Sequence, residues 1–177
     1  MSKRFIVLAC MILAAAATRI LPHPPNIAPI TAVALFSGAY LSDRRLAFLV
    51  PLTALFLSDL ILGFHNQMWV VYGTFALVVC IGFLLRRRWT PLAIAGAALA
   101  SSILFFITSN FGEWALGSLY PKTAQGLLTC FVAAIPFLQN SLVGDAMYST
   151  VLFGGFALFE RWWPALREPN PLRQSVA

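Results

Sequence analysis

Residues 68–88 form the stretch MWVVYGTFALVVCIGFLLRRR, an uncharged apolar run that ends in three arginines. Its length suits a helix that crosses a bilayer, because a helix rises about 1.5 Å per residue and the hydrocarbon core is about 30 Å thick. Basic residues collect in the short loops on the cytoplasmic side of a membrane. The stretch therefore predicts a transmembrane helix whose second end, at Arg86, Arg87 and Arg88, faces the cytoplasm.

The other basic residues follow the same rule along the chain. The sequence has 12 Lys and Arg residues, and only Arg19 and Lys122 fall in the alternate gaps between apolar runs. This asymmetry predicts that both termini are cytoplasmic and that three loops face outward. The remaining basic residues lie at the chain ends and in the other gaps: Lys3, Arg4, Arg44, Arg45, Arg86, Arg87, Arg88, Arg161, Arg167 and Arg173.

The apolar segments predict an all-α integral membrane protein, a six-transmembrane-helix bundle built as a single membrane domain of residues 1–177. Backbone polar groups cannot stay unpaired in lipid, so the segments must be helices. We expect the outward loops to be structured. In the outward loop 110–136 the apolar half is too short to span, which indicates a re-entrant or interfacial segment. The predicted spans are 5–21, 27–41, 46–63, 68–85, 91–109 and 137–159.

The composition excludes several classes of protein. The chain is 60% hydrophobic and 10% charged, with a mean hydropathy of +0.82, whereas a soluble domain is about 25% charged. Its net charge of +6 arises from arginines at span ends, so no nucleic-acid partner is expected. No P-loop is present, so energy from ATP would have to come from another chain. The three cysteines lie on different segments and indicate neither a disulfide framework nor a zinc site.

Two acidic residues, Asp59 and Asp145, are expected inside the membrane, where an ionisable side chain is costly and points to function. Asp145 shares a helix face with Ser141 and Tyr148. It is either a pocket residue, a partner in an interhelical hydrogen bond, or the ion-pair partner of Arg19. Asp59 lies near the outer end of its span, where a structural cap or a clamp on a loop is favoured over a ligand contact.

Cys80 lies deep in the span 68–85. Buried cysteines usually behave as small hydrophobic residues, and the alternative is a thiolate ligand. In a regular helix Cys80 is about 16 Å from Trp69, so an outward pocket would have to be deep, or the start of the helix irregular. His23 and His65 fall in outward loops, and each is either a surface residue or a ligand for a metal or a proton.

Four stretches carry a resemblance to a known family: NIAPITAVALFSGAY at 26–40, SDLILGFH at 58–65, FFITSNF at 105–111 and YPKTAQGLLTC at 120–130. With the short helices and structured outward loops, they resemble the BtuM-type solitary cobalamin transporters, which are similar to the substrate-binding subunits of energy-coupling-factor vitamin transporters. The resemblance covers nearly the whole chain. It implies that Cys80 ligates the cobalt of the corrin ring.

The resemblance implies uptake of cobalamin (vitamin B12) and related corrinoids across the bacterial cytoplasmic (inner) membrane by a multi-pass protein. Cobalamin would be the transported ligand, not a prosthetic group, and a thiolate is a soft ligand that suits its metal. An energy-coupling-factor ATPase module is a candidate partner beside the lipid bilayer. No enzymatic activity is expected beyond slow decyanation of cyanocobalamin. Cys80 is the cobalt ligand that the resemblance implies. The other candidate pocket residues, chosen from position, are Tyr72, Trp114, Tyr120, Asn140, Asp145 and Tyr148.

Two other functions fit the same sequence. One is an S-component-like transporter for another vitamin or small metabolite. The other is a membrane scaffold subunit that transports nothing. A membrane enzyme is disfavoured because the sequence offers no nucleophile–base pair.

Overall fold

The computed structural model describes residues 2–86 and 90–167. Arg87, Arg88 and Arg173, which the topology prediction uses, lie outside the described residues. Within the described ranges the chain is helical and forms no strand. Its elements are α1 (Lys3–Ala17), η1 (Thr18–Ile20), α2 (Ile30–Tyr40), α3 (Arg44–Leu62), α4 (Met68–Leu85), α5 (Pro91–Leu116), α6 (Ala124–Ala133), α7 (Ile135–Ser149), η2 (Thr150–Gly154), α8 (Gly155–Trp162) and η3 (Pro164–Leu166).

Four helices are long and apolar enough to cross a membrane. Three of them are α3, α4 and α5, and the fourth is the continuous helix Ile135–Trp162, in which α7, the π-helical η2 and α8 follow one another. Length and composition of this kind are what a bilayer requires of a spanning helix. The prediction of an all-helical membrane protein is confirmed.

The helix bounds depart from the predicted spans where polar or proline residues occur. The 3₁₀ segment η1 follows α1 inside the predicted span 5–21. α2 begins only at Ile30, directly after Pro29, because a proline disfavours the helical conformation of the residue before it. α5 runs on to Leu116, and α6 lies within the predicted outward loop 110–136. Thr123 caps α6, its hydroxyl accepting from the Gly126 N–H at 3.1 Å.

The short helix α2 forms the centre of the bundle. All 11 of its residues are buried, and it packs against α1, α3, α4, α5 and α7. A helix that is apolar on every side is stable only when surrounded in this way. Its closest crossing is with α4, where a Cβ added at Gly38 would lie 2.2 Å from Val79 O and one added at Gly82 would lie 2.4 Å from Leu35 O. Glycine is therefore required on both helices at this crossing.

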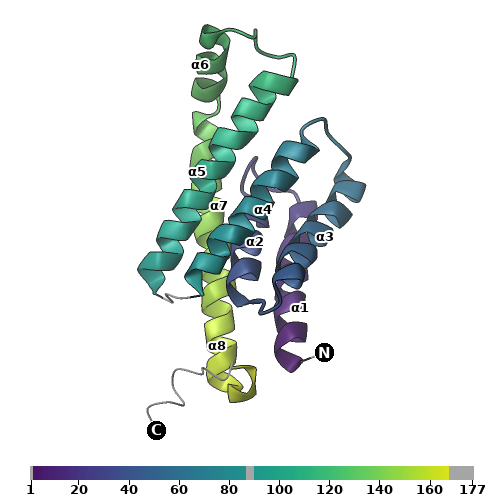
Figure 1. Cartoon of the computed structure of the whole chain (residues 1–177), viewed down its shortest axis with the longest axis vertical. Coiled ribbons are helices and arrows are strands. Elements are labelled where there is room, and N and C mark those ends of the chain that lie inside the picture. The colour runs from purple at the N-terminus through teal and green to yellow at the C-terminus, as the bar shows by residue number, and fades with distance from the viewer. Residues whose placement is uncertain (1, 87–89, 168–177) are drawn as a thin grey trace.

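The bundle has two distinct ends (Figure 1). The connections 21–29, 63–67 and 117–123 all lie toward one end, here called the loop end, with 117–123 extending furthest. The start of α1 and the end of α8 lie together at the other, here called the terminal end, where Arg4 Nη1 donates to Glu160 Oε1 at 2.6 Å.

Candidate functional site

Cys80 lies on the outer face of α4. Its thiol is free and exposed, and the same face carries Trp69, Gly73, Leu77 and Leu84, all exposed and spaced three or four residues apart. We call these five residues the α4 strip. The helix is continuous from Met68, so Cys80 lies about 16 Å along the axis from Trp69. Within the described chain no neighbour covers this strip, so in a bilayer it contacts lipid unless a ligand or a partner lies on it.

Asp59 forms the centre of a polar clamp near the loop end. It is 1% exposed, and it accepts hydrogen bonds from Arg19 at Oδ1 and from the Tyr72 hydroxyl at Oδ2, the latter 2.8 Å long. Arg19 also donates to Ser58 Oγ at 2.6 Å. The clamp ties the end of η1 to α3 and α4. Arg19 therefore pairs with Asp59, and the alternative partner considered from the sequence, Asp145, is not engaged by it.

Two candidate residues on α7 hold the chain that follows α1. Asn140 Nδ2 donates to the Pro25 carbonyl at 2.9 Å. The Tyr148 hydroxyl lies 2.9 Å from the Thr18 hydroxyl, and either group can donate. Asn140 and Tyr148 on α7 thus contact the segment that leads from α1 to α2, and Tyr72 on α4 reaches it through Asp59, which binds Arg19.

Asp145 has different surroundings. It is 3% exposed, with Oδ2 2.5 Å from the Ser102 hydroxyl on α5 and a further hydrogen bond to the side chain of Thr31 on α2. The interhelical hydrogen bond considered from the sequence is what the structure contains. Asp145 therefore lies in the bundle interior, whereas Cys80 faces outward from α4.

Trp114 lies in the last turn of α5, and Tyr120 lies in the connection 117–123 that follows it. The Trp114 indole N–H donates to the Pro121 carbonyl at 3.0 Å. Lys122 folds back so that its ammonium donates to the carbonyls of Trp114 and Gly117. These bonds give the connection 117–123 a defined conformation. Trp114 and Tyr120 therefore lie at the loop end, away from Cys80.

The remaining potential ligands are isolated. His23 and His65 are exposed, and His23 Nδ1 lies 2.7 Å from Leu21 O. In residues 2–86 and 90–167 no group of three or more His, Cys, Asp and Glu side chains could hold a metal ion. Cys130 is 2% exposed and donates to Asn110 O at 3.4 Å, and burial raises the pKa of its thiol.

Arg86 has a structural role that the sequence did not reveal. Its guanidinium donates to the carbonyls of Gly38 at 2.8 Å, Ser42 at 3.3 Å and Leu41. The last carbonyls of a helix have no partner within the helix, so Arg86 satisfies the end of α2 from α4. From the sequence, Arg86 was interpreted only as a basic residue that faces the cytoplasm.

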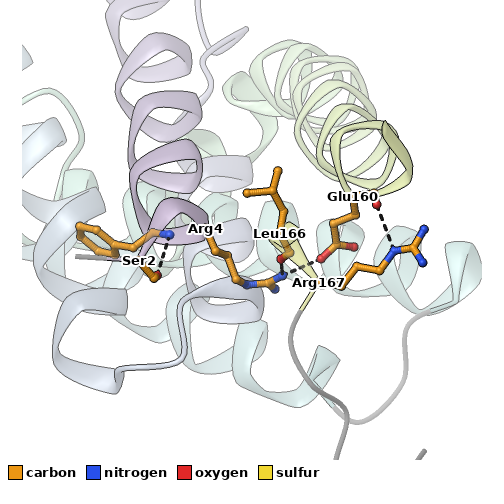
Figure 2. Close-up of polar contacts among 6 residues, drawn as sticks. Ser2, Arg4, Glu160, Leu166 and Arg167 are labelled. Atoms are coloured by element: carbon orange, nitrogen blue, oxygen red, sulfur yellow. Dashed lines mark hydrogen bonds and ion pairs between the residues drawn. The ribbon is translucent and has the colours of Figure 1, made fainter. Parts of the chain in front are cut away.

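Charged residues also meet at the terminal end (Figure 2). Arg4 donates to Glu160 and to the Leu166 carbonyl, and Arg167 Nε donates to the Glu160 carbonyl at 3.0 Å. The Arg4 guanidinium also lies 5.1 Å from the centre of the Phe156 ring, a distance at which a cation and a ring attract. These contacts join the first helix to the last.

A cavity of about 460 Å³ opens beside Arg4. It lies at the terminal end, between the starts of α1 and α3 and the end of α2, and Cys80 is not among the residues that line it. The lining residues are Ser2, Arg4, Phe5, Leu8, Tyr40, Leu41, Ser42, Asp43 and Leu46.

Comparison with known proteins places the chain in a family. A model described as "Family of unknown function (DUF6580)" matches residues 1–166, so the chain belongs to that family. No curated protein and no solved structure matches it.

Proposed function

We propose that this member of the DUF6580 family imports cobalamin and related corrinoids across the bacterial cytoplasmic membrane, and that the Cys80 thiolate binds the cobalt. The observation that carries the proposal is the Cys80 thiol, which is free and exposed at a depth of about 16 Å along α4 from Trp69. Transporters bind their substrates near the bilayer midplane. Cys130, by contrast, is buried.

The surroundings of the thiol suit a large amphipathic ring. A Cβ added at Gly73 would have nothing within 4 Å, so the helix surface beside Leu77 and Cys80 is open. Leu77 and Leu84 provide apolar contact, and Trp69 provides an exposed aromatic ring at the loop end of the strip. Ligand sites are mostly apolar, and the α4 strip is apolar apart from the Cys80 thiol.

The proposed chemistry follows from the ligand type. A thiolate is a soft ligand, and a bound metal deprotonates the thiol that coordinates it. Axial coordination by Cys80 displaces the nucleotide base of cobalamin, so the bound corrinoid is base-off. Donation from sulfur also weakens the bond to cyanide on the opposite face of cyanocobalamin. Slow decyanation then accompanies binding, without making the protein an enzyme.

The proposal includes a topology with six crossings and both termini in the cytoplasm. Four crossings are the long helices. The other two are the continuous Lys3–Ile20 segment and α2, an 11-residue helix that the other helices enclose. The connections at the loop end would then face outward, and the basic residues at the terminal end would face the cytoplasm, as the charge asymmetry requires.

Transport against a gradient needs energy that this chain does not obtain from ATP, because it has no P-loop. A partner such as an energy-coupling-factor ATPase module is one source. Gly96 and Ala100 on α5 are exposed, and small residues at a spacing of four allow a second helix to approach closely. This face supports such docking. An ion gradient is the other source.

Visible spectroscopy of the purified protein tests the ligand assignment. Wild-type protein mixed with cyanocobalamin is expected to co-purify as a coloured complex with a base-off spectrum that changes slowly as cyanide is lost. Cys80→Ala should abolish the spectral change and weaken binding. The fold should survive, since the loss of one exposed side chain costs about 1 kcal/mol or less.

Cys10→Ala is the matched control, because Cys10 is also a free, exposed cysteine on an apolar helix. It should leave the spectrum unchanged. A folded Cys80→Ala protein with the wild-type spectrum would refute the cobalt ligand. A wild-type protein that binds no corrinoid would refute the substrate, and stabilisation by another vitamin would then support the transporter of another metabolite.

A further inference from the structure

A polar stripe runs along the buried face of α7. Ser141, Asp145 and Ser149 are spaced four residues apart, and they are 8%, 3% and 4% exposed. Residues at this spacing share one face of a helix, so a single carboxyl group has a hydroxyl group one turn away in each direction. Ser102 on α5 and Thr31 on α2 face the carboxyl group across the bundle.

No cation accompanies Asp145. Among the described residues its neighbours are hydroxyl groups, and Arg19 is held by Asp59. The helices packed against α7 are α2, α5 and α6. Their titratable side chains are Tyr40, Glu113 and Cys130. Tyr40 contacts the Arg4 guanidinium at the terminal end, Glu113 accepts from Gln67, and Cys130 donates to Asn110 O.

A buried carboxylate without a cation is costly, because it loses its hydration and gains no opposite charge. The neutral carboxylic acid avoids this cost. The surroundings of Asp145 therefore favour the form that carries a proton.

The hydrogen bonds of Ser102 point to the same form. Its Oγ lies 3.0 Å from Ala98 O and 2.5 Å from Asp145 Oδ2. A hydroxyl group has one hydrogen, so it cannot donate fully to both oxygens. Both contacts are satisfied when Ser102 donates to Ala98 and Asp145 donates its own proton to Ser102.

The next turn of the stripe has an unused hydroxyl group. Ser149 Oγ is buried and has no hydrogen-bond partner, a state that costs free energy and calls for an explanation. It lies one turn beyond Asp145 towards the terminal end, immediately before the π-helical η2 (Thr150–Gly154). Such segments interrupt the regular hydrogen bonding of a helix and are common at functional sites. A hydroxyl group that relays a proton from Asp145 would be expected at the position of Ser149.

We propose that Asp145 carries a proton in each transport cycle, so that uptake of the ligand is driven by a proton gradient. The proton enters from water at the loop end past Ser141. It leaves when the O–H bond of the acid breaks, with the electron pair remaining on the carboxylate and the proton passing by way of Ser149 to water at the terminal end. This inference rests on the proposed uptake of corrinoids and supplies its energy source.

Infrared spectroscopy of the full-length protein tests the proton itself without any ligand. Wild-type protein at neutral pH should show the carbonyl stretch of a protonated carboxylic acid, and Asp145→Asn should lack it. Asp43→Asn is the matched control, because it removes an exposed carboxylate that caps α3 and asparagine is an equally good cap. It should retain the band. A wild-type spectrum without the band would overturn the inference.

Uptake into proteoliposomes tests the coupling. With labelled cyanocobalamin outside, an outer pH about one unit below the inner pH should give about tenfold accumulation if one proton accompanies each ligand, and a protonophore should abolish it. Asp145→Asn should still bind the coloured ligand but lose the response to the gradient, while Asp43→Asn behaves as wild type.

Three results would overturn the coupling: accumulation that ignores the pH gradient, accumulation that follows a sodium gradient, and accumulation that requires an added ATPase module. Each of these would leave corrinoid uptake standing. A protein that binds no corrinoid would refute the proposed function and the coupling together, and the infrared band would still decide whether Asp145 holds a proton.

Discussion

Asp59 and Asp145 show at the scale of single residues how one bundle accommodates two buried carboxyl groups. Asp59 has a guanidinium and a phenol as partners, whereas Asp145 has only hydroxyl groups. The first arrangement is suited to holding elements together, and the second to exchanging a proton. Their partners differ because Asp59 faces η1 and α4, whereas Asp145 faces α5 and α2.

The clamp around Asp59 leads to a prediction about stability. Asp59→Leu leaves the Arg19 charge without its partner and should lower the free energy of unfolding by about 3 kcal/mol. The double variant Arg19→Met with Asp59→Leu removes both charges and should recover much of the loss, because apolar pairs often replace buried ion pairs at little cost. Thermal unfolding in detergent measures both. A double variant no more stable than Asp59→Leu would show that the pair does not hold the clamp.

Cys130 gives a prediction about pH. Burial, with a further contribution from the Glu113 carboxylate, raises the pKa of its thiol, and the thiolate is the reactive form. In a variant whose only cysteine is Cys130, alkylation by iodoacetamide should therefore accelerate at a higher pH than it does in the same chain unfolded in detergent. Mass spectrometry of the alkylated fraction across pH measures this. Identical pH profiles for the folded and unfolded chains would contradict the buried placement.

At the scale of elements, α4 is the helix most fully predictable from sequence, because an uninterrupted apolar run ends in arginines. Its outward face was not predictable. The run is apolar on every side, so no periodicity distinguishes the face of Cys80 from the face of Gly82, and only the packing against α2 separates them.

Other elements were less predictable for different physical reasons. The end of α5 carries Asn110 and Glu113, polar residues typical of a loop, yet the helix continues to Leu116. Asn110 donates to the Phe106 carbonyl within the helix, and Glu113 accepts from Gln67 before α4. The partner of Asp59 was not identifiable because Arg19 lies 40 residues away and the sequence does not order the helices in space. The basic residues, by contrast, suffice to propose a topology.

The crossing of α2 and α4 predicts a sharp effect of one methyl group. Gly82→Ala would place Cβ 2.4 Å from the Leu35 carbonyl, so the helices must separate, and overpacking of this kind costs about 1–3 kcal/mol. Gly96→Ala on α5 is the control, because its Cβ meets nothing within 4 Å and alanine favours a helix. Melting temperatures of the two variants measure the difference. Equal melting temperatures would contradict the close crossing.

At the scale of the whole molecule, function depends on orientation in the membrane. The loop end holds the clamp, the α5–α6 connection and the start of the α4 strip, and the terminal end holds the ion pair of Arg4 and Glu160. An importer of the proposed kind needs the loop end outside the membrane and the terminal end in the cytoplasm. The basic residues of the terminal end are consistent with that orientation.

Reporter fusions test the orientation. Fusions near Arg87 and after Arg167 should report a cytoplasmic location, and fusions near Gln67 and Lys122 an external one, because the basic residues retain their loops inside. An alkaline phosphatase and a fluorescent protein give opposite signals at each position and control for expression. A cytoplasmic signal at Lys122 would break the six-crossing topology.

Uptake of labelled cobalamin by living cells tests the central claim most directly. A cobalamin-dependent bacterial strain that lacks its own inner-membrane importer should accumulate the label and grow when it produces the wild-type protein. The same strain should fail to accumulate it with Cys80→Ala, and should succeed with Cys10→Ala at equal membrane levels. No accumulation with the wild-type protein present in the membrane, or full accumulation with Cys80→Ala, would contradict the account.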